Sequence, residues 1–461
     1  MRDMTEKSYR YLRVLILLNF LSLFCIIPTI AETSTDYWAP WVTKTTTNSA
    51  TINWRGENTG LGSIDYATSS YFNKHHRFEK KISTPIATQY QHVPLTGLKP
   101  NTSYTYWVRP SGDESAFGNR TFRTMPVSGP FTFIVISDSQ EGHNYTEMKR
   151  FRYVAEAVAK EQNVLFILHG GDYAGHDSKD LWRIFSQAGD EMLAKFAIFP
   201  TIGNHEYHNS SGDTPTAADQ FHWAFDMPLN YSFDCVGIRF IILDTPDPNN
   251  ANGDDPHTSL ALTQSQESWL GEQLDNDTLL GVFTIHHHPI WDYYNTTANP
   301  DLEPWETLYH TYNISATFAG HTHNYQRYLI KGIPYFIVGN AGGRCADLTG
   351  DVFPAGYKFG VNKTLGYLKV TVDPVHNTAT AQEIFVAHVN EDDDDETPMV
   401  YNPPVIADTI TFPLKAIASP TPSKASKILN KEKIEMGNMH AEAYESGTAT
   451  NNITIATSQG P

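Results

Sequence analysis

Six side chains of types that bind metal ions each follow a short apolar run with the composition of a buried strand. They are Asp138, Asp172, Asn204, His287, His321 and His323. Because the carboxyl ends of strands line the ligand crevice of an open α/β sheet, we expect these side chains to meet at one edge of the sheet. Carboxylate, amide and imidazole groups brought together by separate strands indicate a metal cluster.

Taken singly, each of these motifs also has an ordinary structural explanation. Gly171-Asp172 can be a turn, Gly203-Asn-His-Glu206 a loop and His286-His-His288 a surface cluster. The pair His321 and His323 is more specific, because side chains two residues apart in an extended segment point to the same side. The occurrence of all the motifs in one order, each after an apolar run, favours a functional site.

The segment from Phe131 onward has the pattern of strands alternating with helices. Its apolar runs are 131–136, 164–168, 196–202, 239–243, 282–285, 316–318 and 335–338. Between the first runs, apolar residues recur at helical spacing over 148–158 and 181–192. Continuous buried strands alternating with amphipathic helices predict layers of sheet and helix.

Residues 33–126 have a different composition, rich in Thr, Ser, Tyr and Trp. Apolar and polar residues alternate in 50–54 and 104–108, and Gly, Asn and Pro separate such runs. This pattern predicts an all-β sandwich of about 90 residues. The stretch 98–104 resembles the tyrosine corner of a fibronectin type III domain, and generic β-structure is the alternative.

The two ends of the chain are expected to lie outside the folded domains. Basic residues, the apolar run 14–27 and a small-residue pattern ending at Ala31 are typical of a secretory signal peptide over residues 1–31. That run is short for a transmembrane helix, and an uncleaved anchor is the alternative. A last strand is expected at 408–412, and the Pro-, Ser- and Thr-rich residues 413–461 predict a polar, disordered tail.

The overall charge restricts the class of partner. The chain has 33 Lys and Arg against 51 Asp and Glu, a formal net charge of −18. A field of this sign repels phosphate backbones and anionic lipid, so we expect neither nucleic-acid binding nor stable membrane insertion after signal cleavage. A small anionic substrate remains compatible, since a bound cation dominates its own surroundings. Six consecutive acids at 391–396 predict a solvated spacer, with weak calcium binding as the alternative.

The cysteines and the N-glycosylation sequons are informative about the cellular compartment of the protein. Cys235 and Cys345 remain after the predicted signal peptide, and two distant cysteines leave the question of a disulfide open. Ten Asn-x-Ser/Thr sequons, among them Asn101, Asn230 and Asn313, fit a secreted glycoprotein. Nothing in the sequence indicates an oligomeric state.

Five blocks of the sequence, in order, resemble those of the calcineurin-like metallophosphoesterases. They are Asp138-x-Gln140, Gly171-Asp172, Gly203-Asn-His-Glu206, His287-His-Pro289 and Gly320-His-Thr-His323. The extended last block, 320–327, and the strand pair 231–245 resemble the purple acid phosphatase branch. The resemblance covers residues 36–412. It implies a multidomain α+β protein, with a fibronectin III-like sandwich (33–126) before a four-layer α/β/β/α metallophosphoesterase domain (131–412).

The resemblance also implies roles for the polar side chains. One metal ion would be held by Asp138 and His323, the other by Asn204, His287 and His321, with Asp172 bridging the two. Two ions of Fe, Mn or Zn, about 3.5–4 Å apart, would share a hydroxide that attacks phosphorus. His205 would stabilise the phosphoryl oxygens or protonate the leaving group, and Gln140 and Tyr325 would contact the substrate.

Two positions near the bridging aspartate depart from the family pattern. The family's colour-giving tyrosine stands three residues after the aspartate, where this chain has Gly175, and the ring of Tyr173 is expected to point elsewhere. The protein is therefore expected not to be purple. Gln140 stands where many relatives have His or Gly, and an amide is a feeble metal ligand, so the first metal site is expected to be weak or completed by water.

A further departure concerns acid catalysis. Thr296 and Thr297 stand where the family tends to place a second histidine near the substrate. The acid role would then rest on His205, or on a neighbour among His143, His176 and His208.

The main hypothesis is a secreted dinuclear-metal phosphohydrolase that cleaves small phosphate monoesters in the manner of an acid phosphatase. A phosphodiesterase or nucleotide hydrolase on the same centre is the alternative within the enzyme class, because loops around the mouth set the substrate. A secreted binding protein with an inert α/β domain is the alternative outside that class. The presence of all six ligand residues argues against an inert domain.

Overall fold

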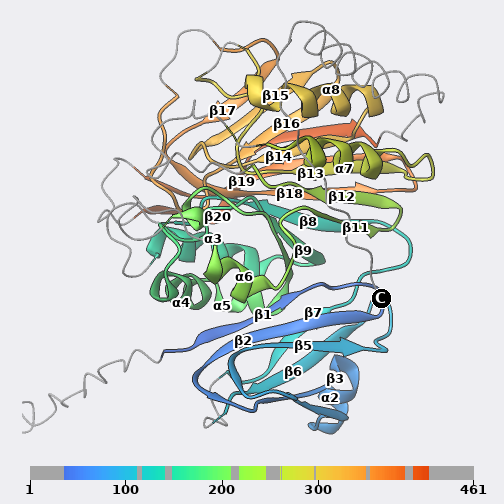
Figure 1. Ribbon diagram of the computed structural model, residues 1–461, viewed down its shortest axis with the longest axis vertical. Helices are drawn as coiled ribbons and strands as arrows, with labels where there is room; N and C mark the ends of the chain where they lie inside the picture. Colours follow the sequence, from blue (N-terminus) through green and yellow to red (C-terminus); the bar gives the residue numbers. More distant parts are fainter. Residues whose placement is uncertain are drawn as a thin grey trace, which may run out of the picture. The chain divides into compact units, whose positions relative to one another are not determined.

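The computed structural model (Figure 1) describes residues 36–111, 117–140, 148–208, 218–245, 260, 262–294, 297–348, 353–389 and 398–414. The predicted signal peptide, His143, Thr296, the acidic run 391–396 and almost all of the predicted tail lie outside the described residues. From Trp38 onward the chain forms one compact unit. No helix in the described ranges is long and apolar enough to cross a membrane.

The N-terminal part consists of two antiparallel sheets, ordered β1-β2-β5 and β4-β3-β6-β7. Its elements are β1 (Trp38–Thr43), β2 (Ser49–Gly60), β3 (Ser63–Thr68), α2 (Ser69–His75), β4 (Lys80–Ser83), β5 (Thr88–Thr96), β6 (Ser103–Arg109) and β7 (Arg120–Arg123). Tyr104, Tyr106 and Val108 lie on one face of β6 and are buried. The Lys99 N–H donates a 2.8 Å hydrogen bond to the Tyr104 hydroxyl, which is the contact of a tyrosine corner. The predicted all-β region is confirmed.

The rest of the described chain forms two larger sheets. The first, ordered β10-β9-β8-β18-β19-β20, contains β8 (Phe131–Ile136), β9 (Val164–His169), β10 (Ala197–Pro200), β18 (Thr364–Asp373), β19 (Thr378–His388) and β20 (Met399–Pro413). The second, ordered β11-β12-β13-β14-β16-β15-β17, contains β11 (Tyr231–Cys235), β12 (Ile238–Ile242), β13 (Gly281–Ile285), β14 (Ala316–Ala319), β15 (Tyr325–Ile330), β16 (Ile333–Val338) and β17 (Tyr357–Val361). Strands β8, β9 and β10 are parallel to one another, as are β12, β13, β14 and β16.

The two sheets pack face to face between layers of helix (Figure 1). Phe133 of the first sheet lies with its ring 5.1 Å from that of Phe240 and 5.6 Å from that of Phe283, both in the second sheet. The first sheet shares a hydrophobic core with α3 (Lys149–Lys160), α4 (Lys179–Ala188), α5 (Asp190–Lys195) and α6 (Asp219–Phe225). The second shares one with α7 (Gln264–Leu274) and α8 (Glu303–Tyr312). The predicted order of helix, sheet, sheet and helix is confirmed.

Two predicted elements differ in extent. The helical pattern over 181–192 is divided into α4 and α5 at Gly189, which has φ −94° and ψ 6°. A Cβ at this glycine would lie 2.9 Å from Leu193 Cδ1, so a larger residue here would have to displace that side chain. The strand expected at 408–412 begins at Met399, because β20 is a mostly exposed edge strand and its N-terminal half lacks the apolar pattern of a buried one.

Strand β1 packs on the helices of the first sheet. Trp41 Nε1 donates a 3.0 Å hydrogen bond to the Ala224 carbonyl in α6, and the Ala39 N–H donates to Ser186 Oγ in α4 at 3.2 Å. Trp38 stacks on Trp182, with ring centroids 6.0 Å apart. The N-terminal sheets therefore share a core with the α/β part.

Cys235, at the end of β11, is buried and has a free thiol. It is therefore not joined to Cys345, which answers the question that the sequence leaves open. Burial raises the pKa of the Cys235 thiol to about 12. At neutral pH this thiol stays protonated and is a poor nucleophile.

Glu383 is a fully buried acid in the middle of β19. Its Oε1 accepts a 2.9 Å hydrogen bond from Asn340 Nδ2, but burial raises the pKa of its carboxyl to about 8. Between the ordinary glutamate pKa and this value, the folded protein holds a proton that the unfolded chain has lost. The free energy of unfolding therefore falls as pH rises through this window, by up to about 1.4 kcal/mol per pH unit.

Glu383→Gln is expected to remove this loss, because a neutral amide needs no proton to stay buried. Urea unfolding of the metal-free protein at pH 5 and pH 8 measures the effect: the variant gains stability over wild type at pH 8 only. Glu156→Gln, at an exposed position of α3, is the matched control. We expect its free energy of unfolding to change between pH 5 and pH 8 as that of wild type does. An equal change in the free energy of unfolding between pH 5 and pH 8 in wild type and Glu383→Gln would contradict the raised pKa of Glu383.

Candidate metal centre

Five strand ends deliver the predicted metal-binding side chains to one place. Asp138 follows β8, Asp172 follows β9 and Asn204 follows β10, all in the first sheet. The second sheet contributes His287 after β13, and His321 with His323 after β14. The structure brings all six together. Five of them form two groups of potential metal ligands, and Asn204 Oδ1 lies within hydrogen-bond distance of His287 and His321.

Backbone geometry at these positions is unusual. Asp138, Asp172 and His321 have positive φ angles of 59°, 56° and 67°, a conformation that costs an L-residue about 1 kcal/mol or more. Two neighbouring glycines allow a close approach of the chain. A Cβ at Gly203 would lie 2.1 Å from Asp172 Oδ1, and one at Gly320 would lie 2.4 Å from Asp138 Oδ2. The glycines of these motifs are therefore required by the packing of the carboxylates.

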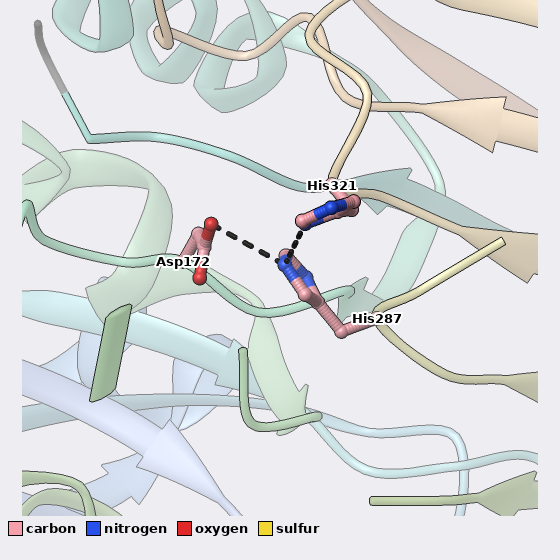
Figure 2. Close-up of side chains that lie close together, drawn as sticks. All are labelled: Asp172, His287 and His321. Atoms are coloured by element: carbon pink, nitrogen blue, oxygen red, sulfur yellow. Dashed lines mark hydrogen bonds and ion pairs between the residues drawn. The ribbon is translucent and has the colours of Figure 1, made fainter. Parts of the chain in front are cut away.

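The first group is built around His287 (Figure 2). Its Nε2 lies 3.3 Å from Asp172 Oδ2, 3.3 Å from His321 Nδ1 and 2.9 Å from Asn204 Oδ1. The other nitrogen of His287, Nδ1, donates to the Gly170 carbonyl at 2.8 Å, which fixes the ring with Nε2 turned toward the cluster. Four oxygen or nitrogen donors thus lie close together, and they fit a metal ion of the Fe, Mn or Zn class.

The second group contains Asp138, Asp172 and His323. His323 Nε2 lies 3.4 Å from Asp138 Oδ1, while its Nδ1 donates to the Arg344 carbonyl at 2.7 Å. Asp172 belongs to both groups, and within each group the potential ligand atoms lie within 4.8 Å of one another. One carboxylate common to two groups is the arrangement of a bridging ligand.

Charges within the cluster shift the pKa values of its members. Burial alone would raise the pKa of Asp172, but the imidazoles of His287 and His205 hold it well below its usual range. Burial works against the charged form of His287 as well, yet Asp172 raises the pKa of His287 to about 9. His321 is different, because burial and the neighbouring His287 lower its pKa to about 3. His321 is therefore neutral, the form in which imidazole binds metal.

Gln140 contacts two of the potential metal ligands, Asp172 and His323. Its side chain is buried, and Nε2 donates to Asp172 Oδ2 at 3.0 Å and lies 3.2 Å from His323 Nε2. Its Oε1 is buried and has no hydrogen-bond partner among the described residues. An unpartnered amide oxygen beside a carboxylate and an imidazole is what a cation-binding site would contain.

His205 is held beside the cluster without joining either group. It begins a short 3-10 helix, His205–Tyr207, and its N–H donates to Asp172 Oδ1 at 3.1 Å. Its Nδ1 donates to the Gly175 carbonyl at 2.7 Å, and its Nε2 lies 3.8 Å from Asp172 Oδ2. The side chain is 19% exposed, so Nε2 stands at the edge of the cluster, within reach of a molecule that enters from solvent.

Tyr173 points away from the cluster, as the sequence predicts. Its ring stacks on His169 at 3.9 Å and its hydroxyl donates to the Thr201 carbonyl. Tyr325 is also directed elsewhere: it is buried and its hydroxyl donates to Asp408 Oδ2 at 2.9 Å. This geometry gives Tyr325 a partner in the fold and offers no support for the predicted contact with substrate. His208 is buried and His176 is half-buried.

Glu206 is the residue whose role the sequence does not reveal. It is buried, and its carboxylate accepts 2.9 Å hydrogen bonds from the backbone N–H groups of Asp172, Tyr173 and Gly203. Burial and the charge of Asp172 raise the pKa of Glu206 despite these donors. Its place as the last residue of Gly203-Asn-His-Glu206 was the only signal. Glu206 ties the loop of Asp172 to the loop of Asn204.

Comparison with known proteins places this geometry in a class. Residues 131–325 match the calcineurin-like phosphoesterase family model. Residues 25–125 match the model of the purple acid phosphatase N-terminal domain. Over residues 131–325 the chain is thus similar to the calcineurin-like phosphoesterases, a class of metal-dependent phosphoric ester hydrolases. Within that class it is purple acid phosphatase-like, because the N-terminal domain of those proteins precedes the phosphoesterase domain.

Individual relatives agree with this assignment. Purple acid phosphatase 21 of Arabidopsis thaliana is 24% identical over 61% of this chain and 67% of its own. The purple acid phosphatase of Glycine max is 24% identical over 70% and 69%. The chain covers only 53% and 56% of two further Arabidopsis purple acid phosphatases.

Two solved structures share the fold. The structure of PhoD superposes with a TM-score of 0.61 at 15% identity, over 84% of this chain and 92% of that one. Purple acid phosphatase PPD1 from yellow lupin superposes with a TM-score of 0.60 at 15% identity, over 82% and 74%.

The iron-loaded protein is expected to lack a strong visible charge-transfer band. The reason is that Gly175 offers no phenolate and the Tyr173 hydroxyl is bonded to Thr201. An absorption spectrum of the protein reconstituted with iron, with the zinc-loaded protein as its control, measures this. An intense visible band present with iron and absent with zinc would contradict the assignment.

Proposed function

We propose that the protein is a dinuclear-metal phosphohydrolase that cleaves phosphate monoesters. The observation that carries the proposal is the carboxylate of Asp172, which belongs to both groups of potential ligands. The likeness to purple acid phosphatases supports the same class of reaction. The six ligand side chains are all in place, which argues against an inert binding domain.

Each ion would have its own protein ligands as well as the shared one. Asp138 and His323 would hold the first, and Asn204, His287 and His321 the second, with Asp172 between them. When bound, two ions of Fe, Mn or Zn would supply a nucleophile near neutral pH and neutralise charge on the phosphoryl oxygens. Gln140 would keep Asp172 oriented through its Nε2, with its unpartnered Oε1 available to the first ion or to water.

His205 would act on the substrate rather than on the metals. Because its Nδ1–H is held by the Gly175 carbonyl, its Nε2 is the nitrogen free to face the substrate. In the imidazolium form Nε2–H can donate to a phosphoryl oxygen or give its proton to the leaving alkoxide. The leaving group then departs as a neutral alcohol.

The setting of the enzyme follows from the sequence. A signal peptide over residues 1–31 would direct the chain out of the cytoplasm, and residues 33–126 and 131–412 would be its fibronectin III-like and catalytic domains, before a tail over 413–461. The substrate would be a small phosphorylated molecule. The net charge of −18 supports the exclusion of nucleic acid as a partner.

A phosphodiesterase or nucleotide hydrolase is the second candidate. Gly175 and Gln140 favour it, since both change the surroundings of the first metal site relative to the purple enzymes. The distinguishing experiment compares p-nitrophenyl phosphate with bis-p-nitrophenyl phosphate, using residues 32–461 reconstituted with Mn, Zn or Fe across pH. Faster turnover of the monoester supports the proposal. Faster turnover of the diester assigns the second function, and no turnover of either ester by metal-loaded protein overturns both.

A further inference from the structure

Two neighbouring loops of the second sheet contain three of the proposed metal ligands. The loop after β13 contains His287, and the loop after β14 contains His321 and His323. A buried hydrogen bond joins the two loops: Thr322 Oγ1 donates to Asp292 Oδ2 at 2.8 Å. Both side chains are 3% exposed, so this contact is shielded from water.

Thr322 is placed to control both imidazoles. It lies between His321 and His323 in the chain, within a tight turn in which its N–H donates to the Gly320 carbonyl and its carbonyl accepts from the Asn324 N–H. Holding its side chain therefore holds the backbone from which the two histidines project. His321 also has a positive φ of 67°, so the turn needs support from its surroundings.

The other partner, Asp292, is itself fixed. Its Oδ1 accepts a 2.5 Å hydrogen bond from the Tyr294 N–H. A second contact joins the same loops nearby: the Tyr293 N–H donates to Gln326 Oε1 at 3.1 Å, and Gln326 Nε2 donates to Asn324 Oδ1 at 2.8 Å. The loop of His287 and the loop of the two other histidines are thus linked at Thr322 and again, through Gln326, at Asn324.

The link bears on metal binding because the two loops set the spacing of the imidazoles that they contain. His287 Nε2 and His321 Nδ1 lie 3.3 Å apart, near enough for both to reach one metal ion as long as the two loops keep this spacing. Outer contacts that hold ligands in this way typically affect metal affinity by roughly 10–100-fold.

We propose that Asp292 and Thr322 are positioning residues that preorganise the two histidine-bearing loops for metal binding. The inference rests on the proposed metal centre and adds to it two residues outside the ligand set. Neither residue touches the reacting atoms; both act through His287, His321 and His323. The hydrogen bond fixes the geometry of the two loops. We therefore expect its loss to lower metal affinity more than it lowers the free energy of unfolding.

The test measures metal dissociation constants of the metal-free full chain by competition with a chromophoric chelator, using Mn and Zn. Thr322→Val has the same shape without the hydroxyl, and its affinity is expected to fall by roughly 10–100-fold. Thr322→Ser keeps the hydroxyl and is expected to stay within a few-fold of wild type. Asp292→Asn keeps an acceptor without the charge, and its loss of affinity is expected to be intermediate, because charge-assisted hydrogen bonds are the stronger ones.

A matched control separates positioning from stability. Thr132 Oγ1 and Thr371 Oγ1 form a 3.0 Å hydrogen bond between β8 and β18, and Thr132→Val should leave both dissociation constants unchanged at whatever cost to thermal stability. Thr322→Val with wild-type affinity, or Thr132→Val with an equal loss, overturns the inference. Wild-type protein that binds no metal overturns the metal centre and the inference together, whereas two ions bound with wild-type affinity by every variant overturn the inference alone.

Discussion

Asp172→Asn is expected to lower metal-dependent hydrolysis by roughly a thousandfold or more while the protein stays folded. The loss of one electrostatic contact to a transition state costs roughly 10²–10³-fold. Here the same change also removes the only negative charge common to the two ligand groups. An amide cannot neutralise two cations, so we expect the variant to lose one of the two bound ions in addition to its turnover. Steady-state rates, with metal content measured on the same samples, test both effects.

The control for this variant is a half-buried acid outside both ligand groups. Asp408 in β20 pairs with Arg327, at 2.6 Å between Oδ2 and Nε, and Asp408→Asn should lower stability while retaining two ions and turnover at permissive temperature. Turnover by Asp172→Asn close to that of wild type would contradict the role of the shared carboxylate.

His205→Ala is expected to lower turnover by roughly 10²–10⁴-fold and leave both ions bound. The size of the effect depends on the leaving group. A p-nitrophenolate leaves without a proton, whereas an alkoxide needs one, so a proton donor at Nε2 matters more for glycerol phosphate than for p-nitrophenyl phosphate. Comparing both substrates distinguishes a proton donor from a group that only stabilises the phosphoryl oxygens, whose loss slows both equally.

His176→Ala is the matched control for His205, because His176 is a half-buried imidazole near it. Burial, and to a lesser extent the neighbouring His205, lower the pKa of His176. This variant should stay within a few-fold of wild type on both substrates. An equal loss in His176→Ala would move the acid role to that neighbour. No loss in His205→Ala would show that neither substrate depends on Nε2.

Much of the fold follows from the sequence because most strands of the α/β part are buried on both faces. The run 131–136 coincides with β8, and 316–318 lies within β14 (Ala316–Ala319). Strands β18 and β19 could not be predicted from continuous apolar runs, since polar residues such as Lys369, Thr371 and Gln382 interrupt their apolar residues. β20 shows the same limit, because its residues before 408 face solvent at the sheet edge.

The cluster could be predicted because its members share one rule, a polar residue after a buried strand. The contacts that orient it could not. Glu206 accepts from three backbone N–H groups on two loops, and Asp292 meets Thr322 across 30 positions of the chain. Such pairs form only when the tertiary structure brings loops together. For Tyr325 the family pattern suggested a substrate contact, whereas the fold uses its hydroxyl to bind Asp408.

The most direct test of the two-metal centre is a titration of the metal-free protein with Mn or Zn, in which bound metal and hydrolysis of p-nitrophenyl phosphate are followed together. We expect two ions per chain, turnover that requires both, and complete loss of turnover on adding EDTA. Full turnover with one ion per chain, or turnover that persists in EDTA without bound metal, would contradict the two-metal centre.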